Sequence, residues 1–343
     1  LSMKSISRML VASLIMSLSV SAANVFAADS LNVYSARKEA LIKPILDDFT
    51  KETGITVKLI TGKDDALLTR IVKEGRNTPA DILITTDAGR LHRAKEANVT
   101  ATFSSPLLEK NIPAHYRDSD KQWVGLSLRA RPIMYVKGRI DPKELSTYEA
   151  LADPKWKKRI CIRSSNNIYN QSLVASLIKH NGEEATQQWV KGLVSNLARK
   201  PQGGDRDQIK AAVAGLCDVA VANTYYLAGM LNADADSQAI AQQIAVFWPN
   251  QNDRGTHVNV SGAAIIKHSK NQANALKLIE YLSGDHAQQW YAEKNGEYPV
   301  RDNIKMSSTL AAWGNFKADT LSLSELGRLN KDAVMLMDRA GWR

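Results

Sequence analysis

Ala80-Asp81-Ile82-Leu83-Ile84-Thr85-Thr86 is a short, almost continuous apolar run that leads into a helix-like stretch at residues 88–97. A strand that is apolar on both faces is typical of a parallel sheet covered by helices on both sides. Two more strand-helix pairs come before it, at 31–34 and 40–53 and at 55–60 and 64–73. This βαβαβα order predicts an α/β sheet with a ligand site at the carboxyl ends of its strands.

The same alternation returns in the second half of the chain. We expect strands at 160–163 and 219–223 and helices at 172–179, 183–199, 271–282, 286–293 and 321–343. Three extended segments, 124–126, 132–136 and 258–266, can cross between the halves. The length exceeds what one ordinary core requires. The pattern therefore predicts two α/β lobes joined by extended crossovers, a hinged clamp typical of solute-binding proteins.

Residues 1–27 have the three parts of a secretory signal peptide. Lys4 and Arg8 give a basic start, residues 9–20 are mostly apolar, and Val25-Phe26-Ala27 supplies the small residues that signal peptidase reads. We expect cleavage after residue 27 and export to the periplasm. The apolar part is shorter than the roughly 20 residues that span a membrane, and no cysteine follows it that could carry a lipid anchor.

The formal net charge is +10, and it falls to +8 once Lys4 and Arg8 are removed with the leader. A basic balance can indicate nucleic acid or an anionic surface as the partner, but the charges are scattered and no basic run is interleaved with aromatic residues. The chain also lacks a recognised nucleic-acid motif. We therefore expect a monomer that binds no nucleic acid and does not insert stably into a membrane.

Tyr225 and Tyr226 follow directly after the apolar run 216–222, and Tyr169 follows the short strand-like run 159–162. Three phenols from two strand-to-helix junctions can converge on one point. Phenolate is a hard anionic oxygen donor, and hard donors suit hard cations. The alternative is ordinary packing, because the chain has ten tyrosines and most tyrosines are amphipathic packing residues.

Seven motifs extend this pattern over residues 31–343. They are Asn32-Val33-Tyr34-Ser35-Ala36-Arg37, Thr78-Pro79-Ala80-Asp81-Ile82, Gly125-Leu126-Ser127-Leu128-Arg129-Ala130-Arg131, Ser164-Ser165-Asn166-Asn167-Ile168-Tyr169-Asn170, Asn223-Thr224-Tyr225-Tyr226, His257-Val258-Asn259-Val260-Ser261-Gly262 and Asp338-Arg339-Ala340-Gly341-Trp342. In content and order the motifs resemble the periplasmic ferric-iron-binding proteins of bacterial iron(III) ABC importers.

The resemblance implies a type II periplasmic-binding fold, in which each lobe is a mixed sheet flanked by helices and one Fe(III) lies between the lobes. It implies phenolate ligands at Tyr169, Tyr225 and Tyr226, with Arg129 beside the metal or its bound anion. Arg131 is a further candidate for the anion, and the alternative for both arginines is a surface or interlobe salt bridge. The partner would be the membrane permease of an iron importer. The expected lobes are 28–127 with 258–310, and 128–257, with helices in 311–343 packed against both.

Many relatives carry a histidine and a tyrosine, or a histidine alone, soon after the first strand, whereas this chain has Lys38-Glu39. Glu39 is therefore a candidate ligand, and its alternative is a carboxylate favoured by the start of a helix. A free phenol has a pKa near 10, so a trivalent cation must displace the phenol protons as it binds. Glu39, water or a small anion such as carbonate can complete the shell, and Arg129 would balance the added negative charge.

Cys161 and Cys217 are the only cysteines, and each lies eight positions before a candidate ligand, Tyr169 or Tyr225. An isolated pair in an oxidising periplasm favours a disulfide, and two buried free thiols are the alternative. His257 lies in a family-like motif, where we expect it to form hydrogen bonds at the hinge.

Two other functions remain open. A clamp of the same fold could capture a small organic or inorganic anion with Arg129, Arg131, Ser164 and Ser165. A periplasmic hydrolase could use Ser164 or Ser165, but the chain has no GxSxG elbow and no convincing Ser-His-Asp set, so we do not expect an enzyme. Colour separates the first alternative from iron binding, because ferric phenolate absorbs visible light.

Overall fold

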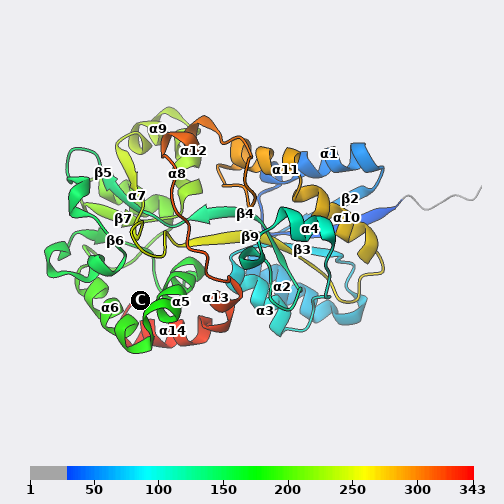
Figure 1. Cartoon of the computed structure of the whole chain (residues 1–343), viewed down its shortest axis with the longest axis horizontal. Helices are drawn as coiled ribbons and strands as arrows, with labels where there is room; N and C mark the ends of the chain where they lie inside the picture. Colours follow the sequence, from blue (N-terminus) through cyan, green and yellow to red (C-terminus); the bar gives the residue numbers. More distant parts are fainter. Residues whose placement is uncertain (1–28) are drawn as a thin grey trace, which may run out of the picture.

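Two sheets organise the chain, and each has its own helices (Figure 1). The computed structural model describes residues 29–343, so the predicted signal peptide lies outside the described residues. One sheet has the order β2-β1-β3-β9-β4, with β1 Ser30–Ser35, β2 Thr56–Thr61, β3 Ile82–Thr86, β4 Val124–Ala130 and β9 Val258–Ile265. The other has the order β6-β7-β5-β8, with β5 Ile133–Val136, β6 Ile160–Cys161, β7 Val219–Val221 and β8 Ile244–Phe247. We call the two parts the five-stranded half and the four-stranded half.

Both sheets are mixed. In the five-stranded half β1 is parallel to β2 and β3, while β9 is antiparallel to β3 and β4. In the four-stranded half β6 is parallel to β7, and β5 is antiparallel to β7 and β8. The mixed sheets of the expected fold are therefore confirmed, while the fully parallel sheet suggested by the first βαβαβα run is limited to β2, β1 and β3.

Helices flank both sheets (Figure 1). Their bounds are α1 Lys43–Thr53, α2 Asp64–Glu74, α3 Ala88–Glu96, α4 Pro106–Asn111, α5 Ile168–Asn181, α6 Glu183–Ser195, α7 Asp205–Val213, α8 Thr224–Leu231, α9 Ala235–Ala241, α10 Gln272–Leu282, α11 Asp285–Trp290, α12 Ser308–Ala312, α13 Ser324–Arg328 and α14 Asn330–Arg339. None of the helices among the described residues is long and apolar enough to cross a membrane.

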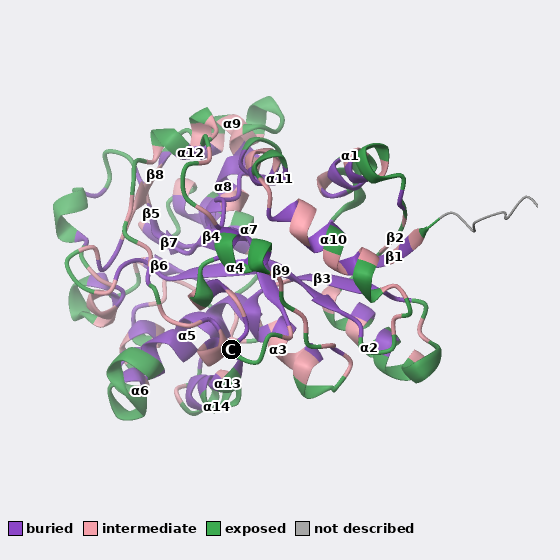
Figure 2. Cartoon of the chain, turned by 45° about the vertical axis from the view of Figure 1, so that its right-hand side comes forward, coloured by how far each residue is buried: buried purple, intermediate pink, exposed green. Residues whose placement is uncertain are grey.

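The long strands β4 and β9 run through the middle of the molecule and lead from one half to the other (Figure 1). Every residue in both strands is buried, as the purple centre of Figure 2 shows. The chain passes from β4, which ends at Ala130, into β5, which begins at Ile133 in the other sheet. The pairing continues past the strand ends, because the Arg131 N–H donates to the His257 carbonyl (3.1 Å). These strands are the extended crossovers that the sequence predicts.

The predicted strands and helices of residues 31–97 match the structure closely, because the helices in this part of the chain have one apolar face. In α1, Ile45 and Phe49 are buried. Gly54 then ends the helix with a left-handed φ of 75°, and its N–H donates to the Thr50 carbonyl (2.8 Å), a conformation that favours glycine.

The prediction is less accurate in the four-stranded half. The helix expected from residue 172 begins at Ile168, because the Asn167 side chain caps it by accepting from the Tyr169 N–H (3.1 Å). The sequence patterns also missed α7, α8, α9 and β8. The helix expected at 321–343 is two helices, α13 and α14.

The C-terminal segment packs against both halves. Helix α13 contacts α3 of the five-stranded half and α5 of the four-stranded half. Gly327 in α13 allows a close approach, because a Cβ there would lie 2.2 Å from the Cβ of His92 in α3. On the other side, Glu325 pairs with Lys179 of α5 (3.1 Å). Near the chain end, the Trp342 indole N–H donates to the Arg163 carbonyl (2.9 Å).

Candidate metal centre

Three phenols meet at the start of two helices. Tyr169 is in the first turn of α5, and Tyr225 and Tyr226 are in the first turn of α8. The hydroxyl oxygens of Tyr169 and Tyr225 are 3.0 Å apart, and the rings of Tyr225 and Tyr226 lie with their centroids 4.2 Å apart at an interplanar angle of 32°. Tyr225 and Tyr226 are half-buried, whereas Tyr169 is only 8 % exposed. The three side chains predicted to converge therefore do so.

The convergence follows from the strands that lead into these helices. β6 and β7 are parallel neighbours, with Cys161 opposite Ala220, so α5 and α8 both start beyond the same edge of the sheet. Cys161 and Cys217 form a disulfide (S–S 2.07 Å), as predicted. It closes a loop of 56 residues, and a loop of this length stabilises the fold by about 4 kcal/mol in the chain-entropy model.

The surroundings of Tyr225 and Tyr226 keep both phenols neutral. Burial raises the pKa of Tyr225 well above its ordinary value, and the neighbouring Tyr169 raises it further. Burial and the same neighbour also raise the pKa of Tyr226. Negative charge on one of these oxygens disfavours charge on the next. Only a concentrated positive charge among the three oxygens would ionise them together at neutral pH.

Arg129 and Arg131 lie behind the phenols on and just after β4, and both are 1 % exposed. The Arg129 guanidinium lies 5.2 Å from the centre of the Tyr225 ring and donates to the Val260 carbonyl (3.2 Å) and to the Ser261 hydroxyl. Arg129 therefore brings positive charge from the five-stranded half to a phenol of the four-stranded half.

The Arg131 guanidinium lies 5.9 Å from the centre of the Tyr169 ring. It donates to Asp205 (3.0 Å), Asn223 (2.9 Å) and Asn170 (2.7 Å). Because these three partners occupy its guanidinium, Arg131 positions the first turns of α5 and α8. The sequence alone did not assign it this role.

Asp205 is a residue that sequence reasoning missed. It is fully buried at the start of α7, pairs with Arg131 and Arg163, and accepts from the Asn223 N–H (2.6 Å). Arg163 in turn lies 5.7 Å from the centre of the Tyr169 ring. The signal that could have found Asp205 is the Gly203-Gly204-Asp205 sequence, because an acidic residue after glycines is typical of a helix start.

A second missed group is the buried pair of Arg37 and Glu297 (2.5 Å). Arg37 follows β1 and also donates to the hydroxyls of Ser261 (2.7 Å) and Ser127 (3.4 Å). Burial raises the pKa of Glu297, but the charges of Arg37 and Arg129 outweigh that effect and hold the pKa below its ordinary value. Arg37 lies in a quoted motif, but nothing in the sequence points to a partner 260 residues away.

Asp87 completes the wall on the five-stranded side. It is fully buried at the start of α3 with φ 78°, and it accepts from the Gly89 N–H (2.8 Å) and the Ser172 hydroxyl (2.7 Å). The Ser172 contact ties α3 to α5 across the two halves. Burial raises the pKa of Asp87, and the hydrogen bond from Ser172 offsets part of that rise.

A narrow enclosed gap lies between Tyr169 and residues of the crossover strands. Its lining residues are Asp87, Arg129, Arg131, Tyr169, Asn223, His257 and Asn259. Five of them contribute a buried polar atom that has no partner among the described residues: Asp87 Oδ2, Arg129 Nε, Arg131 Nε, Asn223 Nδ2 and Asn259 Nδ2. Buried polar atoms are normally satisfied, so this concentration of one unpaired acceptor and four unpaired donors marks the region as a site rather than ordinary core.

Glu39 does not join the cluster. It is exposed in a 3₁₀ turn, Glu39–Leu41, and no hydrogen bond or ion pair connects its carboxylate to the phenols or arginines among the described residues. It lines an open hollow along α1 with Lys43 and Asp47. Ser164 is likewise occupied locally, because its hydroxyl accepts from the Asn166 N–H (3.1 Å).

His257 is buried in the crossover, where its N–H donates to the Tyr148 hydroxyl (3.1 Å) and its carbonyl accepts from the Arg131 N–H. Its main chain therefore forms the hinge hydrogen bonds that the sequence predicts. Burial, and then the charge of Arg131, lower the pKa of its imidazole to about 3, so the ring is neutral.

The donor set fits a hard trivalent cation. No group of three or more His, Cys, Asp and Glu side chains in residues 29–343 is arranged to hold a metal. The tyrosine cluster offers only phenol oxygens, which suit Fe(III) better than softer metals. The guanidinium groups around the cluster favour negative charge on these oxygens.

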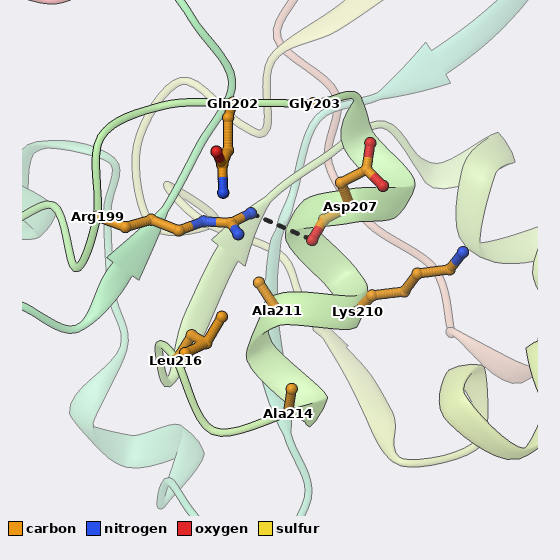
Figure 3. Close-up of a pocket in the computed structure, with 8 residues that line it drawn as sticks. All are labelled: Arg199, Gln202, Gly203, Asp207, Lys210, Ala211, Ala214 and Leu216. Carbon is orange, nitrogen blue, oxygen red and sulfur yellow. Dashed lines mark hydrogen bonds between the residues drawn. The ribbon is translucent and has the colours of Figure 1, made fainter.

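A separate hollow opens beside α7 (Figure 3). Arg199 and Gln202 lie on one side of it and Ala211, Ala214 and Leu216 on the other. Arg199 donates to the Asp207 carbonyl (3.4 Å), as the dashed line shows. The hollow contains none of the residues that the sequence predicted for the site.

Two α/β halves, linked by long crossover strands and closing on a polar site, define a two-lobed type II solute-binding protein. The model of the bacterial extracellular solute-binding protein family matches residues 77–318. The chain belongs to this family.

Known relatives are similar in sequence to this chain over most of its length. It is 49% identical over 314 residues to "Iron uptake protein A1" of Synechocystis, covering 91% of this chain and 87% of the relative. It is 29% identical to the "Fe(3+)-binding periplasmic protein" of Serratia marcescens, covering 90% and 89%.

Solved structures have the same fold. A Trichodesmium protein determined "in complex with iron and citrate ligands" has a TM-score of 0.90 and 49% identity, covering 92% of this chain and 100% of that one. A Mannheimia haemolytica ferric iron-binding protein in an open conformation has a TM-score of 0.87 and 45% identity, covering 92% and 99%.

Proposed function

We propose that this protein captures Fe(III) between its halves through the phenolate oxygens of Tyr169, Tyr225 and Tyr226 and delivers it to an ABC importer. The observation that carries the proposal is the approach of the Tyr169 and Tyr225 hydroxyls to 3.0 Å beside Tyr226. Hydroxyls at this separation can face one cation. The names of the Synechocystis and Serratia relatives, which refer to iron, support the same cargo.

Binding would exchange phenol protons for the metal. Each phenol releases its proton to solvent as its oxygen joins Fe(III), so uptake strengthens as pH rises. Three phenolates balance the charge of the ion. Arg129, which lies over the Tyr225 ring, would hold a small anion such as carbonate, and that anion or water would complete the shell. Glu39 remains a candidate for this place only if the turn that carries it moves toward the phenols.

The same geometry accounts for closure on the ligand. The phenols belong to the four-stranded half, and Arg129 and Asp87 belong to the five-stranded half. A cargo that contacts both walls stabilises the closed arrangement by its difference in affinity for the closed and open forms. The proposed lobes are 28–127 with 258–310, and 128–257. Strand β4 extends to Ala130, beyond the first boundary.

Solute-binding proteins of ABC importers work with a membrane permease, and we place this chain in the periplasm as the monomeric partner of an iron permease, after removal of residues 1–27. Capture of a small anion alone is less well supported, because Asp205, Asn223 and Asn170 already occupy Arg131. A hydrolase is also less well supported, since Ser164 has only a local backbone partner among the described residues. The family is one of binding proteins.

Metal content and the visible spectrum of protein purified from periplasm test the proposal. We expect one Fe(III) per chain and an orange to red colour from phenolate-to-iron charge transfer. The triple variant Tyr169→Phe, Tyr225→Phe, Tyr226→Phe should be colourless and free of iron while it keeps its fold by circular dichroism. A triple variant that keeps iron at the wild-type affinity would place the site elsewhere.

A further inference from the structure

Arg206 occupies an unusual position beside the candidate site. It is exposed in the first turn of α7, and its guanidinium lies 4.9 Å from the centre of the Tyr226 ring. In residues 29–343 its side chain has no hydrogen bond and no carboxylate within ion-pair distance. Arg206 is therefore an available positive charge in contact with a half-buried phenol of the cluster.

Two features of the chain fix this position. The preceding residue, Asp205, is buried and bound to Arg131 and to the Asn223 N–H, which holds the first turn of α7 against the cluster. Gly229 in α8 leaves room for the guanidinium, because a Cβ at Gly229 would lie 3.2 Å from Arg206 Nη2. The backbone of α7 and the absence of a side chain on α8 together seat Arg206 over Tyr226.

The other arginines around the phenols are already engaged. Arg37 pairs with Glu297, Arg90 with Asp64 (3.4 Å), and Arg131 and Arg163 with Asp205. Arg129 is buried and donates to Val260 and Ser261. Arg206 differs from these arginines in two ways. It is exposed to solvent, and none of its N–H donors has a partner among residues 29–343.

We propose that Arg206 receives a carboxylate of the chelator that presents iron, so that the site takes Fe(III) from anionic polycarboxylate chelates in preference to neutral ones. This inference rests on the proposed iron-binding function. A guanidinium binds carboxylate oxygens in pairs, and an exposed charge beside a site accelerates the encounter with an oppositely charged ligand. In the exchange, Fe(III) passes from carboxylate to phenolate oxygens, the phenol protons go to solvent, and the iron keeps its oxidation state.

The test compares iron transfer from two chelates by stopped-flow absorbance of the charge-transfer band. Ferric citrate in excess citrate is anionic, and ferric tris(acetohydroxamate) is neutral. The variant is Arg206→Gln, and the matched control is Lys210→Gln, because Lys210 is an exposed cation one turn further along α7 (Figure 3).

At low ionic strength Arg206→Gln should slow capture from ferric citrate by about tenfold, within the range of electrostatic steering. Capture from the neutral chelate should keep its wild-type rate, and Lys210→Gln should resemble wild type with both chelates. The difference should shrink in about 0.5 M salt, where the screening length is only a few ångströms. Arg206→Lys should keep most of the rate at low salt, because it keeps the charge.

Two results would overturn the inference and leave the iron-binding proposal standing. Equal rates for Arg206→Gln and Lys210→Gln with ferric citrate would show that Arg206 does not meet the chelate. Equal slowing of Arg206→Gln with both chelates would show that Arg206 acts through Tyr226 alone. A wild-type protein that takes iron from neither chelate contradicts the iron-binding proposal itself, and this inference falls with it.

Discussion

The two walls of the candidate site hold their charge in different ways. The wall formed by α5 and α8 presents the phenols of Tyr169, Tyr225 and Tyr226, from which an arriving cation would displace protons. The opposite wall presents fixed charges such as Arg37 and Glu297, which already pair with each other (2.5 Å). One wall would therefore change its protonation when cargo binds, while the other keeps its charges in place. The proposed ligands therefore belong to the four-stranded half, whereas this fixed ion pair belongs to the five-stranded half.

Breaking the fixed wall should have the largest effect. Arg37→Gln leaves the carboxylate of Glu297 buried without its partner, and loss of one member of a buried pair costs about 4 kcal/mol of unfolding free energy. Chemical denaturation at pH 7 measures the loss. The double variant Arg37→Met, Glu297→Leu should recover most of it, since no lone charge stays buried. A single variant as stable as wild type would show that the pair does not organise this wall.

Removing one phenol oxygen should have the next largest effect. Tyr225→Phe keeps the ring against Tyr226 but deletes a proposed ligand, so Fe(III) affinity should fall by at least about a hundredfold, the upper end of what loss of an outer-shell partner costs. Tyr298→Phe is the control, because the Tyr298 hydroxyl is buried without a partner among the described residues. Competition titration against citrate measures both. Equal affinity for the two variants would contradict the assignment of Tyr225.

The tyrosine wall could be predicted from the sequence because its geometry is local. Tyr169 and Tyr225 each follow a short strand and begin a helix, and the pairing of β6 with β7 brings both helix starts together. Even here the predicted start of α5 was wrong. The helix was expected from its apolar residues, whereas its true start is set by the polar cap at Asn167, which apolar periodicity does not reveal. The disulfide between Cys161 and Cys217 was predictable for the same reason, since both cysteines precede those junctions.

The fixed wall could not be predicted in the same way because its contacts are distant in sequence. Arg37 and Glu297 are 260 residues apart, and no local pattern pairs them. Asp87 adopts φ 78°, which a non-glycine residue accepts only when tertiary contacts enforce it. The sequence pattern predicted strands at the positions of β1, β3 and β9. It did not predict the strand order of the sheet, in which β9 lies between β3 and β4.

His257 sharpens the comparison by adding a pH dependence to the crossover beside the fixed wall. Its folded pKa is about 3 and its unfolded pKa is about 6.5, so the unfolded chain binds the proton first as pH falls. Its contribution to stability is therefore complete above about pH 6.5 and declines toward pH 3, by about 2 kcal/mol between pH 7 and pH 5. Denaturation midpoints across this range measure the decline.

The matched variants are His257→Asn and His268→Asn, because His268 is exposed. His257→Asn should lower stability at pH 7 but flatten its decline between pH 7 and pH 5. His268→Asn should leave the slope of wild type unchanged. The same slope in all three proteins would mean that His257 is not held neutral by its burial.

Glu39 should give the smallest effect, because it belongs to neither wall. It is exposed in the turn Glu39–Leu41, and its carboxylate has no contact with the phenols or with Arg129 in the described part of the chain. Glu39→Gln should change the free energy of unfolding by no more than about 0.5 kcal/mol, as is usual for surface substitutions. It should also leave Fe(III) affinity and the position of the charge-transfer band at their wild-type values. Lys38→Gln, at the neighbouring position, controls for the loss of a charge near the same turn. If Glu39→Gln alone shifts the band while the bound anion is retained, the carboxylate reaches the metal in the loaded protein, and ligands then come from both halves.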